Sequence, residues 1–195
     1  MLIKGKIENE QYKRLIKYAF QKSDAIMFVF RKDGFNDQQI SKLEKTSNDL
    51  KTEFKDYVLK IRNGAYWVFT KVGYSKLGIY NSKFKDPPNF DKLFEVLFYK
   101  TNKELEEYVL SNSNLYSWLN PYYPEDISFF KNGYCWLYSI AHEELCDIYC
   151  ENEEEYNYLK SIGIEFIDNK FIETSNNNLY FENYNIENKN SDIQI

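Results

Sequence analysis

The sequence predicts an α+β protein in which mixed or antiparallel β-sheets, built partly from β-hairpins, pack against several helices. Two Asn-Gly dipeptides, Asn63-Gly64 and Asn132-Gly133, separate strand-like runs. Asn-Gly is a strong hairpin signal because both turn positions need positive φ. Other stretches place apolar residues three and four apart behind capping residues, which is typical of amphipathic helices. Apolar residues make up 43% of the 195, enough to build a core of ordinary size.

Residues 1–54 are expected to form a strand, a helix, a second strand and further helix. Residues 2–7 alternate weakly between apolar and polar side chains, which predicts a short opening strand. Asn9 is expected to cap the first helix, and residues 25–30 form a continuous apolar run typical of a strand buried on both faces. Asn36 is expected to cap either one long helix or two. The two apolar helical stripes consist of Tyr12, Leu15, Ile16, Ala19 and Phe20, and of Ile40, Leu43, Leu50 and Phe54.

The next segment is expected to be a three-stranded meander that turns first at Asn63-Gly64. Its expected strands are 57–62, 65–72 and 76–80. Two prolines in residues 85–89 stop both helix and strand, and they predict an exposed connection. Residues 90–99 are apolar with mixed periodicity, which leaves helix and strand both open.

Two helices are expected in the second half of the chain. Thr101 and Glu104 have the form of a capping box, so a helix or helix pair should begin there and end at Asn120-Pro121. Asn152 is expected to begin another helix, which Gly163 ends.

The second hairpin is centred on Asn132-Gly133, and its register should place Phe129 opposite Trp136. A further strand and a last hairpin are expected after it. The strands expected in this half are 127–131, 134–140, 145–150, 164–167 and 170–172.

These elements are expected to form one compact domain over residues 1–173, with possible sub-lobes at 1–84 and 90–173. Residues 174–195 form an Asn-rich tail that is either disordered or an extended arm. No segment has the apolar length of a signal peptide or a membrane-spanning helix, which predicts a cytoplasmic protein with no membrane partner. An odd number of cysteines then predicts reduced thiols at Cys135, Cys146 and Cys150.

Charge is distributed unevenly along the chain. Residues 1–100 contain 20 Lys and Arg against 12 Asp and Glu, whereas residues 101–195 contain 5 against 18. One explanation is that the two halves attract and pack on each other. The other is that an acidic face meets a basic partner, because complementary fields speed association and reject wrong partners.

The favoured function is a non-enzymatic inhibitor that binds another protein, one with a basic surface, through the acidic and Tyr-rich C-terminal half. It would be of the toxin-immunity or phage anti-defence (anti-CRISPR) type. No cofactor is expected for such a role. The expected partner-binding residues are Glu151, Glu153, Glu154, Glu155 and Tyr156.

An alternative is a small hydrolase-like enzyme that uses His142 with Glu143 or Cys146. The run His142 to Cys146 begins like the zinc-protease pattern H-E-x-x-H, but its fifth residue is Cys and the chain has a single histidine. No metal centre is therefore expected. The structural interpretation, that His142 and Glu143 hold the turn between two strands, is favoured over this one.

A nucleic-acid-binding protein that uses the basic N-terminal half is a further alternative. Its basic residues are spread through ordinary amphipathic elements, and the pI is about 5.1, so direct contact with nucleic acid is not expected. The basic residues concerned are Lys13, Arg14, Lys17, Arg31 and Lys32.

One segment resembles a pattern found in uncharacterised proteins of Gram-positive bacteria and their mobile elements. It consists of residues 124–133 (PEDISFFKNG), then Cys135-Trp136, residues 139–143 (SIAHE) and the acidic helix that ends at residues 162–164. Some members of that group are immunity-like or defence-associated. The resemblance implies no catalytic residue, and it does not extend to the first 120 residues.

Overall fold

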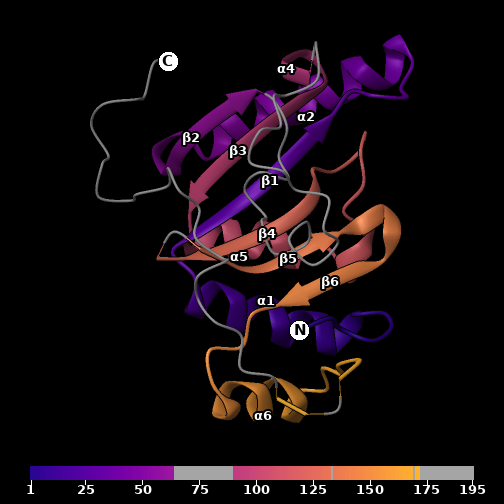
Figure 1. Ribbon diagram of the computed structural model, residues 1–195. Coiled ribbons are helices and arrows are strands. Elements are labelled where there is room, and N and C mark those ends of the chain that lie inside the picture. Colours follow the sequence, from indigo (N-terminus) through magenta and orange to yellow (C-terminus); the bar gives the residue numbers. More distant parts are fainter. Residues whose placement is uncertain (64–89, 133, 169, 172–195) are drawn as a thin grey trace, which may run out of the picture.

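A computed structural model describes residues 1–63, 90–132, 134–168 and 170–171. Its strands are β1 (Ala25–Arg31), β2 (Val58–Asn63), β3 (Phe94–Lys100), β4 (Glu125–Lys131), β5 (Tyr134–Ile140) and β6 (Leu145–Ile148). They form a six-stranded sheet in the order β2-β3-β1-β4-β5-β6, with every neighbouring pair antiparallel (Figure 1). The predicted α+β class is confirmed, and this sheet is antiparallel.

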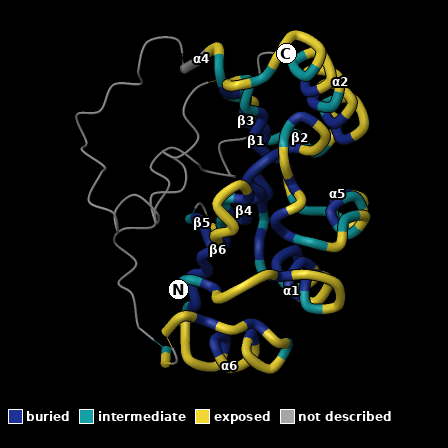
Figure 2. Tube along the Cα trace, turned by 90° about the vertical axis from the view of Figure 1, so that its right-hand side faces the viewer, coloured by how far each residue is buried: buried dark blue, intermediate teal, exposed yellow. Residues whose placement is uncertain are grey.

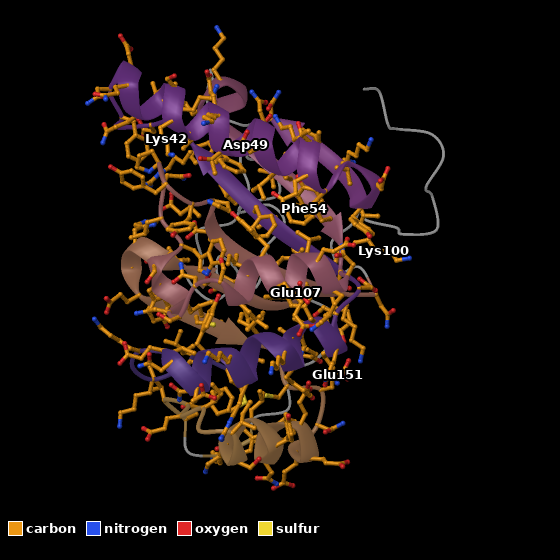
Figure 3. The ribbon with its side chains drawn as sticks, turned by 180° about the vertical axis from the view of Figure 1, so that it is seen from behind. Lys42, Asp49, Phe54, Lys100, Glu107 and Glu151 are labelled. Atoms are coloured by element: carbon orange, nitrogen blue, oxygen red, sulfur yellow. The ribbon has the colours of Figure 1, made fainter. Side chains whose placement is uncertain are left out.

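The helices are α1 (Asn9–Lys22), α2 (Asp37–Glu53), α4 (Phe90–Leu93), α5 (Lys103–Leu110) and α6 (Glu153–Ser161), and short 3-10 turns are η1 (Lys55–Tyr57), η2 (Leu115–Ser117) and η3 (Ala141–Glu143). Three of them cover one face of the sheet. Figures 2 and 3 show α2, α5 and α1 one after another on the same side of the sheet. The remaining long helix, α6, lies beyond α1 at one end of the molecule.

The central strand β1 sends its side chains alternately to the two faces of the sheet. Ile26, Phe28 and Phe30 join the core beneath the helices. Residues 25, 27 and 29 join a second cluster on the opposite face, together with Phe98 and Phe130. A strand buried on both faces is expected to be apolar throughout, which explains the continuous run in the sequence.

Both N-terminal helices follow the predicted apolar stripes. The buried residues of α1 are Tyr12, Leu15, Ile16, Ala19 and Phe20. The second helix, α2, is a single helix. Asn36 caps it and forms a capping box with Gln39, with the Gln39 N–H donating to the Asn36 side chain at 3.0 Å. Its periodicity breaks at Ser47 because that side chain is buried and donates to Glu95 on β3.

Two predicted caps are wrong by one residue. The cap position of α1 is Glu8, which makes no side-chain capping bond, and the N–H of Asn9 donates to the carbonyl of Ser113 at 2.6 Å. The cap of α5 is Asn102, whose side chain accepts from the Leu105 N–H at 3.0 Å. At the start of α1 the Asn9 backbone bonds to the distant Ser113, and at the start of α5 the neighbouring Asn102 takes the cap position from Thr101. The sequence alone does not rank these alternatives.

Residues 1–4 run between β6 and residues 165–167 without forming the regular opening strand that was predicted. They make isolated bridges only. Ile148 N–H donates to the Met1 carbonyl at 3.0 Å, and Ile3 N–H donates to the Cys146 carbonyl at 2.9 Å. This segment therefore continues the hydrogen bonding of the sheet at its β6 edge.

The ambiguous stretch 90–99 contains both kinds of structure. Its first four residues form α4, and the rest belongs to β3, which pairs with β1 and β2. The first strand predicted for the meander corresponds to β2. Its turn at Gly64, its strands at 65–72 and 76–80 and the proline break at 85–89 lie outside the described residues. Strands from both proposed sub-lobes share one sheet, while the domain boundary at 173 stays a prediction.

The second Asn-Gly hairpin is confirmed as β4 and β5, but its register differs from the prediction. Phe129 pairs with Leu137, and Phe130 pairs with Cys135. Trp136 is therefore the extra residue of a β-bulge. The bulge places Trp136 and Leu137 in the same core beneath the helices, whereas strict alternation would send them to opposite faces.

The C-terminal part of the described chain is partly as predicted. Asn152 caps α6, and Gly163, with φ of 98°, follows its end. Residues 164–168 and 170–171 contain one isolated bridge, from Phe166 to Ile3, and no hairpin strand. The tail at 174–195 lies outside the described residues. Within the part of the chain that is described, no helix has the length and apolar character needed to cross a membrane.

Candidate functional site

The start of α6 carries the residues predicted to bind a partner, and the structure divides them into two groups. Glu153 and Glu154 are exposed. Glu155 is only 4% exposed, and Tyr156 is buried with its ring stacked on Phe166. The sequence pattern that places acidic residues in the first turn does not show which of them point inward.

Glu155 is the centre of a buried polar network. Its carboxylate accepts hydrogen bonds from Trp136 Nε1 at 3.1 Å and from the Tyr18 hydroxyl at 3.1 Å. It also accepts from the Glu151 N–H at 2.7 Å and pairs with Lys22 at 3.1 Å. This side chain therefore joins α1, β5 and α6. Its carboxylate oxygens are already occupied by contacts within the chain and are not exposed to a partner.

Glu151 is half-buried between two ammonium groups. Lys22 and Lys131 donate to its carboxylate at 2.8 Å and 2.7 Å, and the Tyr134 hydroxyl donates to it as well. Burial by itself raises the pKa of Glu151, but these hydrogen bonds outweigh burial and lower the pKa to about 2. Like Glu155, Glu151 is largely occupied by contacts within the chain.

Replacing Glu151 by Gln should remove part of the acid sensitivity of the fold. The carboxylate stabilises the folded state fully above its ordinary unfolded pKa, and this stabilisation is lost as the pH falls toward the folded value of about 2. Between about pH 6 and about pH 3 we expect the free energy of unfolding of the wild type to fall by ~2 kcal/mol more than that of the variant. The reason is that the folded carboxylate, with its lowered pKa, binds fewer protons than the unfolded one. Urea unfolding at both pH values measures the difference. The exposed Glu153→Gln serves as control, and equal losses in wild type and Glu151→Gln would contradict this role.

His142 lies in η3, the turn that joins β5 to β6, and it lies closer to Glu125 than to Glu143, the partner expected from the sequence. Nδ1 lies 3.0 Å from Oε1 of Glu125, whereas Nε2 lies 3.8 Å from Glu143. The imidazole is 36% exposed, so one side of it faces solvent. Glu144 ends the turn with φ of 51°.

Glu125 and Asp126 begin β4, directly beside the end of β5 that carries His142. Asp126 is an extra residue between the β1 pairings of Glu125 and Ser128, and its φ is 55°. One of its oxygens accepts from the Ala141 N–H at 2.8 Å, which ties the start of β4 to η3. The antiparallel hairpin therefore brings the two acidic residues and the histidine to the same end of the sheet.

Two further polar side chains contact the Glu125 carboxylate, which is 2% exposed. Asn120 Nδ2 donates to Oε2 at 2.7 Å, and Arg31 Nη2 lies 3.5 Å from Oε1. Three buried atoms of this group make no hydrogen bond: Glu125 Oε1, Asn120 Oδ1 and Arg31 Nε. Buried polar atoms without partners are rare in folded proteins, so their concentration around one carboxylate marks this cluster.

No family model, curated protein or solved structure matches this chain. Function is therefore inferred from side-chain geometry and charge. The sequence contained one signal that would have found Glu125 and Asp126: they directly precede a hairpin whose other strand ends just before His142.

The cysteine proposed as a nucleophile is enclosed in the core. Burial, followed by the nearby Asp147 charge, raises the pKa of the Cys146 thiol well above its ordinary value. Burial likewise raises the pKa of Cys135, and that of Cys150 to about 12. Because the thiolate is the nucleophile and these environments disfavour it, the described geometry gives no support to cysteine catalysis.

Proposed function

We propose that the protein is a non-enzymatic inhibitor that acts in the cytoplasm by binding another protein with a basic surface. The observation that carries this proposal is the charge exposed on the described C-terminal half. In residues 101–171, eight Asp and Glu are exposed against three Lys. Residues 1–63 and 92–100 contain eight exposed acidic residues and ten exposed basic ones. The acidic excess therefore belongs to the surface of one half.

Attraction between the two halves accounts for only some of the uneven charge. Lys22 neutralises Glu151 and Glu155, and Arg31 approaches Glu125. These acidic residues are buried or half-buried and lie outside the exposed count. Among the exposed carboxylates of this half, Glu144 pairs with Lys6 at 3.4 Å. Exposed carboxylates of one sign attract a basic partner and steer its approach.

The outer surface of α6 is the best-placed part of this acidic half. Glu153 and Glu154 are exposed in its first turn. Tyr158 is exposed one helical turn after Glu154, on the same face, and its ring packs against Tyr18 of α1. Aromatic side chains are enriched in protein interfaces, so Tyr158 would supply contact area beside the charge of the two carboxylates. The inhibitor that we propose is of the toxin-immunity or phage anti-defence type.

Charge reversal at α6 tests the proposal. The partner is isolated from the source cells by cross-linking to the full chain, purified, and titrated with the wild type and Glu153→Lys/Glu154→Lys by calorimetry. We expect the double variant to bind roughly 10-fold more weakly or worse, and the wild-type association rate to fall with added salt.

A matched control changes the charge by the same amount elsewhere. Asp49→Lys/Glu53→Lys alters two exposed residues of α2, which lies at the far end of the helical layer (Figure 3). This control should bind within roughly 3-fold of the wild type, since it leaves α6 unchanged. Equal effects of the two double variants, or none for the α6 variant, would show that the acidic surface of α6 is not the binding site.

A further inference from the structure

We propose that Glu125, Asp126 and His142 form a binding site for a divalent transition-metal ion. The three residues come from the start of β4 and from the turn η3. One ligand atom of each lies within 4.8 Å of the others. A metal ion draws such atoms to a common centre, and imidazole nitrogen and carboxylate oxygen are both usual ligands of divalent metals. This site is independent of the acidic surface of α6.

The contact between His142 and Glu125 is the first observation that points to a ligand. Nδ1 and Oε1 are 3.0 Å apart, a hydrogen-bond distance, yet Oε1 accepts no hydrogen bond. A buried carboxylate oxygen this close to an imidazole nitrogen, with no hydrogen bond between them, is open to a cation that both atoms could bind.

Unsatisfied acceptors are the second observation. Glu125 Oε1 is buried, and so is the Asn120 Oδ1 atom of the side chain that donates to the other Glu125 oxygen. Both are oxygen acceptors without a donor, and leaving such groups unpaired in the interior is costly. A cation bound at Glu125 Oε1 would supply this buried oxygen with the partner that it lacks.

The charge balance of the cluster favours a cation as well. Glu125 and Asp126 are both buried carboxylates, and the described positive group on Glu125 Oε1 is the single guanidinium of Arg31 at 3.5 Å. At 3.5 Å the guanidinium is beyond close ion-pair contact with the buried Glu125 carboxylate, and a divalent ion bound directly to Oε1 would compensate its charge more fully. Arg31 is the competitor for Oε1, and its side chain is 32% exposed, so it has solvent into which it can withdraw.

The ligand types select the class of metal. One imidazole nitrogen with carboxylate oxygens suits Zn²⁺ or Mn²⁺, whereas Mg²⁺ and Ca²⁺ prefer oxygen alone and Cu⁺ prefers thiolates. The thiol of Cys146 is buried in the core, and its raised pKa disfavours the thiolate. The exposed side of His142 gives the ion a route of entry, and three protein ligands leave a coordination position open.

Metal titration of the full chain tests the proposal. The protein is stripped with EDTA, dialysed, and titrated with ZnCl₂ and separately with MnCl₂ by calorimetry. We expect one ion per chain and a raised melting temperature, because an ion that binds only the folded state stabilises it. His142→Ala should weaken binding by roughly 100-fold, since it removes one of three protein ligands, and this exposed substitution should leave the fold intact. Glu143→Gln, a neighbour that is not a proposed ligand, should bind within roughly 3-fold of the wild type.

Arg31→Gln provides a second variant with an effect of opposite sign. It removes the cation that competes for Glu125 Oε1, so zinc affinity should rise several-fold rather than fall. A role for Arg31 in merely holding the fold would not produce this increase. The proposal is overturned if neither ion binds, if His142→Ala binds as well as the wild type, or if Co²⁺ binding gives a thiolate charge-transfer band. The last result would place the metal on the cysteines. None of these outcomes depends on the protein partner.

Discussion

Replacing Trp118 by Ala should lower the free energy of unfolding by ~4 kcal/mol, within the range measured for large-to-small changes of buried aromatic residues. The side chain is fully buried. Its ring contacts those of Phe28, Tyr108 and Tyr123, with centroids 5.3–6.4 Å apart. The substitution therefore removes an aromatic junction between β1, α5 and the loop before β4.

The hydrogen bond of the indole adds to this cost. Trp118 Nε1 donates to the Tyr12 hydroxyl at 2.9 Å, and that hydroxyl donates to the Val109 carbonyl at 2.8 Å. Losing the indole leaves a buried hydroxyl with one partner fewer. Urea unfolding measures the total, and Tyr122→Ala is the control because Tyr122 is 68% exposed and should change stability by less than about 0.5 kcal/mol. A loss below about 1 kcal/mol for Trp118→Ala would contradict the role of this junction.

Replacing Glu155 by Ala should destabilise the fold by about 3–5 kcal/mol, the usual result of removing one partner from a buried charge network. The substitution leaves Trp136 Nε1 and the Glu151 N–H without their acceptor, and Lys22 keeps only Glu151. This large effect on stability distinguishes Glu155 from a partner-binding residue.

Glu154→Ala is the matched control for this prediction. Glu154 is the preceding residue of the same helix and is exposed, so its loss should change the free energy of unfolding by about 0.5 kcal/mol or less. Thermal and urea unfolding of both variants give the comparison. If Glu155→Ala unfolds at the same urea concentration as Glu154→Ala, the buried network does not stabilise the fold as described.

Features of the fold that depend on local pattern could be predicted from the sequence. The apolar stripe of α1, the buried strand β1 and the Asn36 cap of α2 all arise from residues within a few positions of one another. Hairpin β4–β5 followed from Asn132-Gly133 for the same reason, since the turn residues decide the connection.

Features that depend on distant partners could not be predicted. Trp136 occupies a bulge because both it and Leu137 find room in the core beneath the helices. Residues 90–99 change from helix to strand where pairing with β1 and β2 begins. Tertiary contacts override local propensity in such segments.

The same limit applies to the candidate sites. Glu153, Glu154 and Glu155 look alike in the sequence, but only the third turns toward Lys22 and Trp136. Strand register places Glu125 beside His142, and a sequence pattern does not show this register. The sequence suggests Glu143 as the partner because it is the next residue, but Glu143 lies farther from the imidazole.

The backbone of residues 1–4 has a consequence for association between molecules. An open strand edge offers unpaired N–H and C=O groups to any other extended chain and so invites aggregation. Here the outer edge of β6 is already used, because Ile148 donates to Met1 and Ile3 donates to Cys146. On its other side the same segment is held by Glu165, which accepts from Lys4, and by Ile167, which donates to Leu2. The first residues thus occupy this edge with main-chain hydrogen bonds and protect it from strand addition by another molecule.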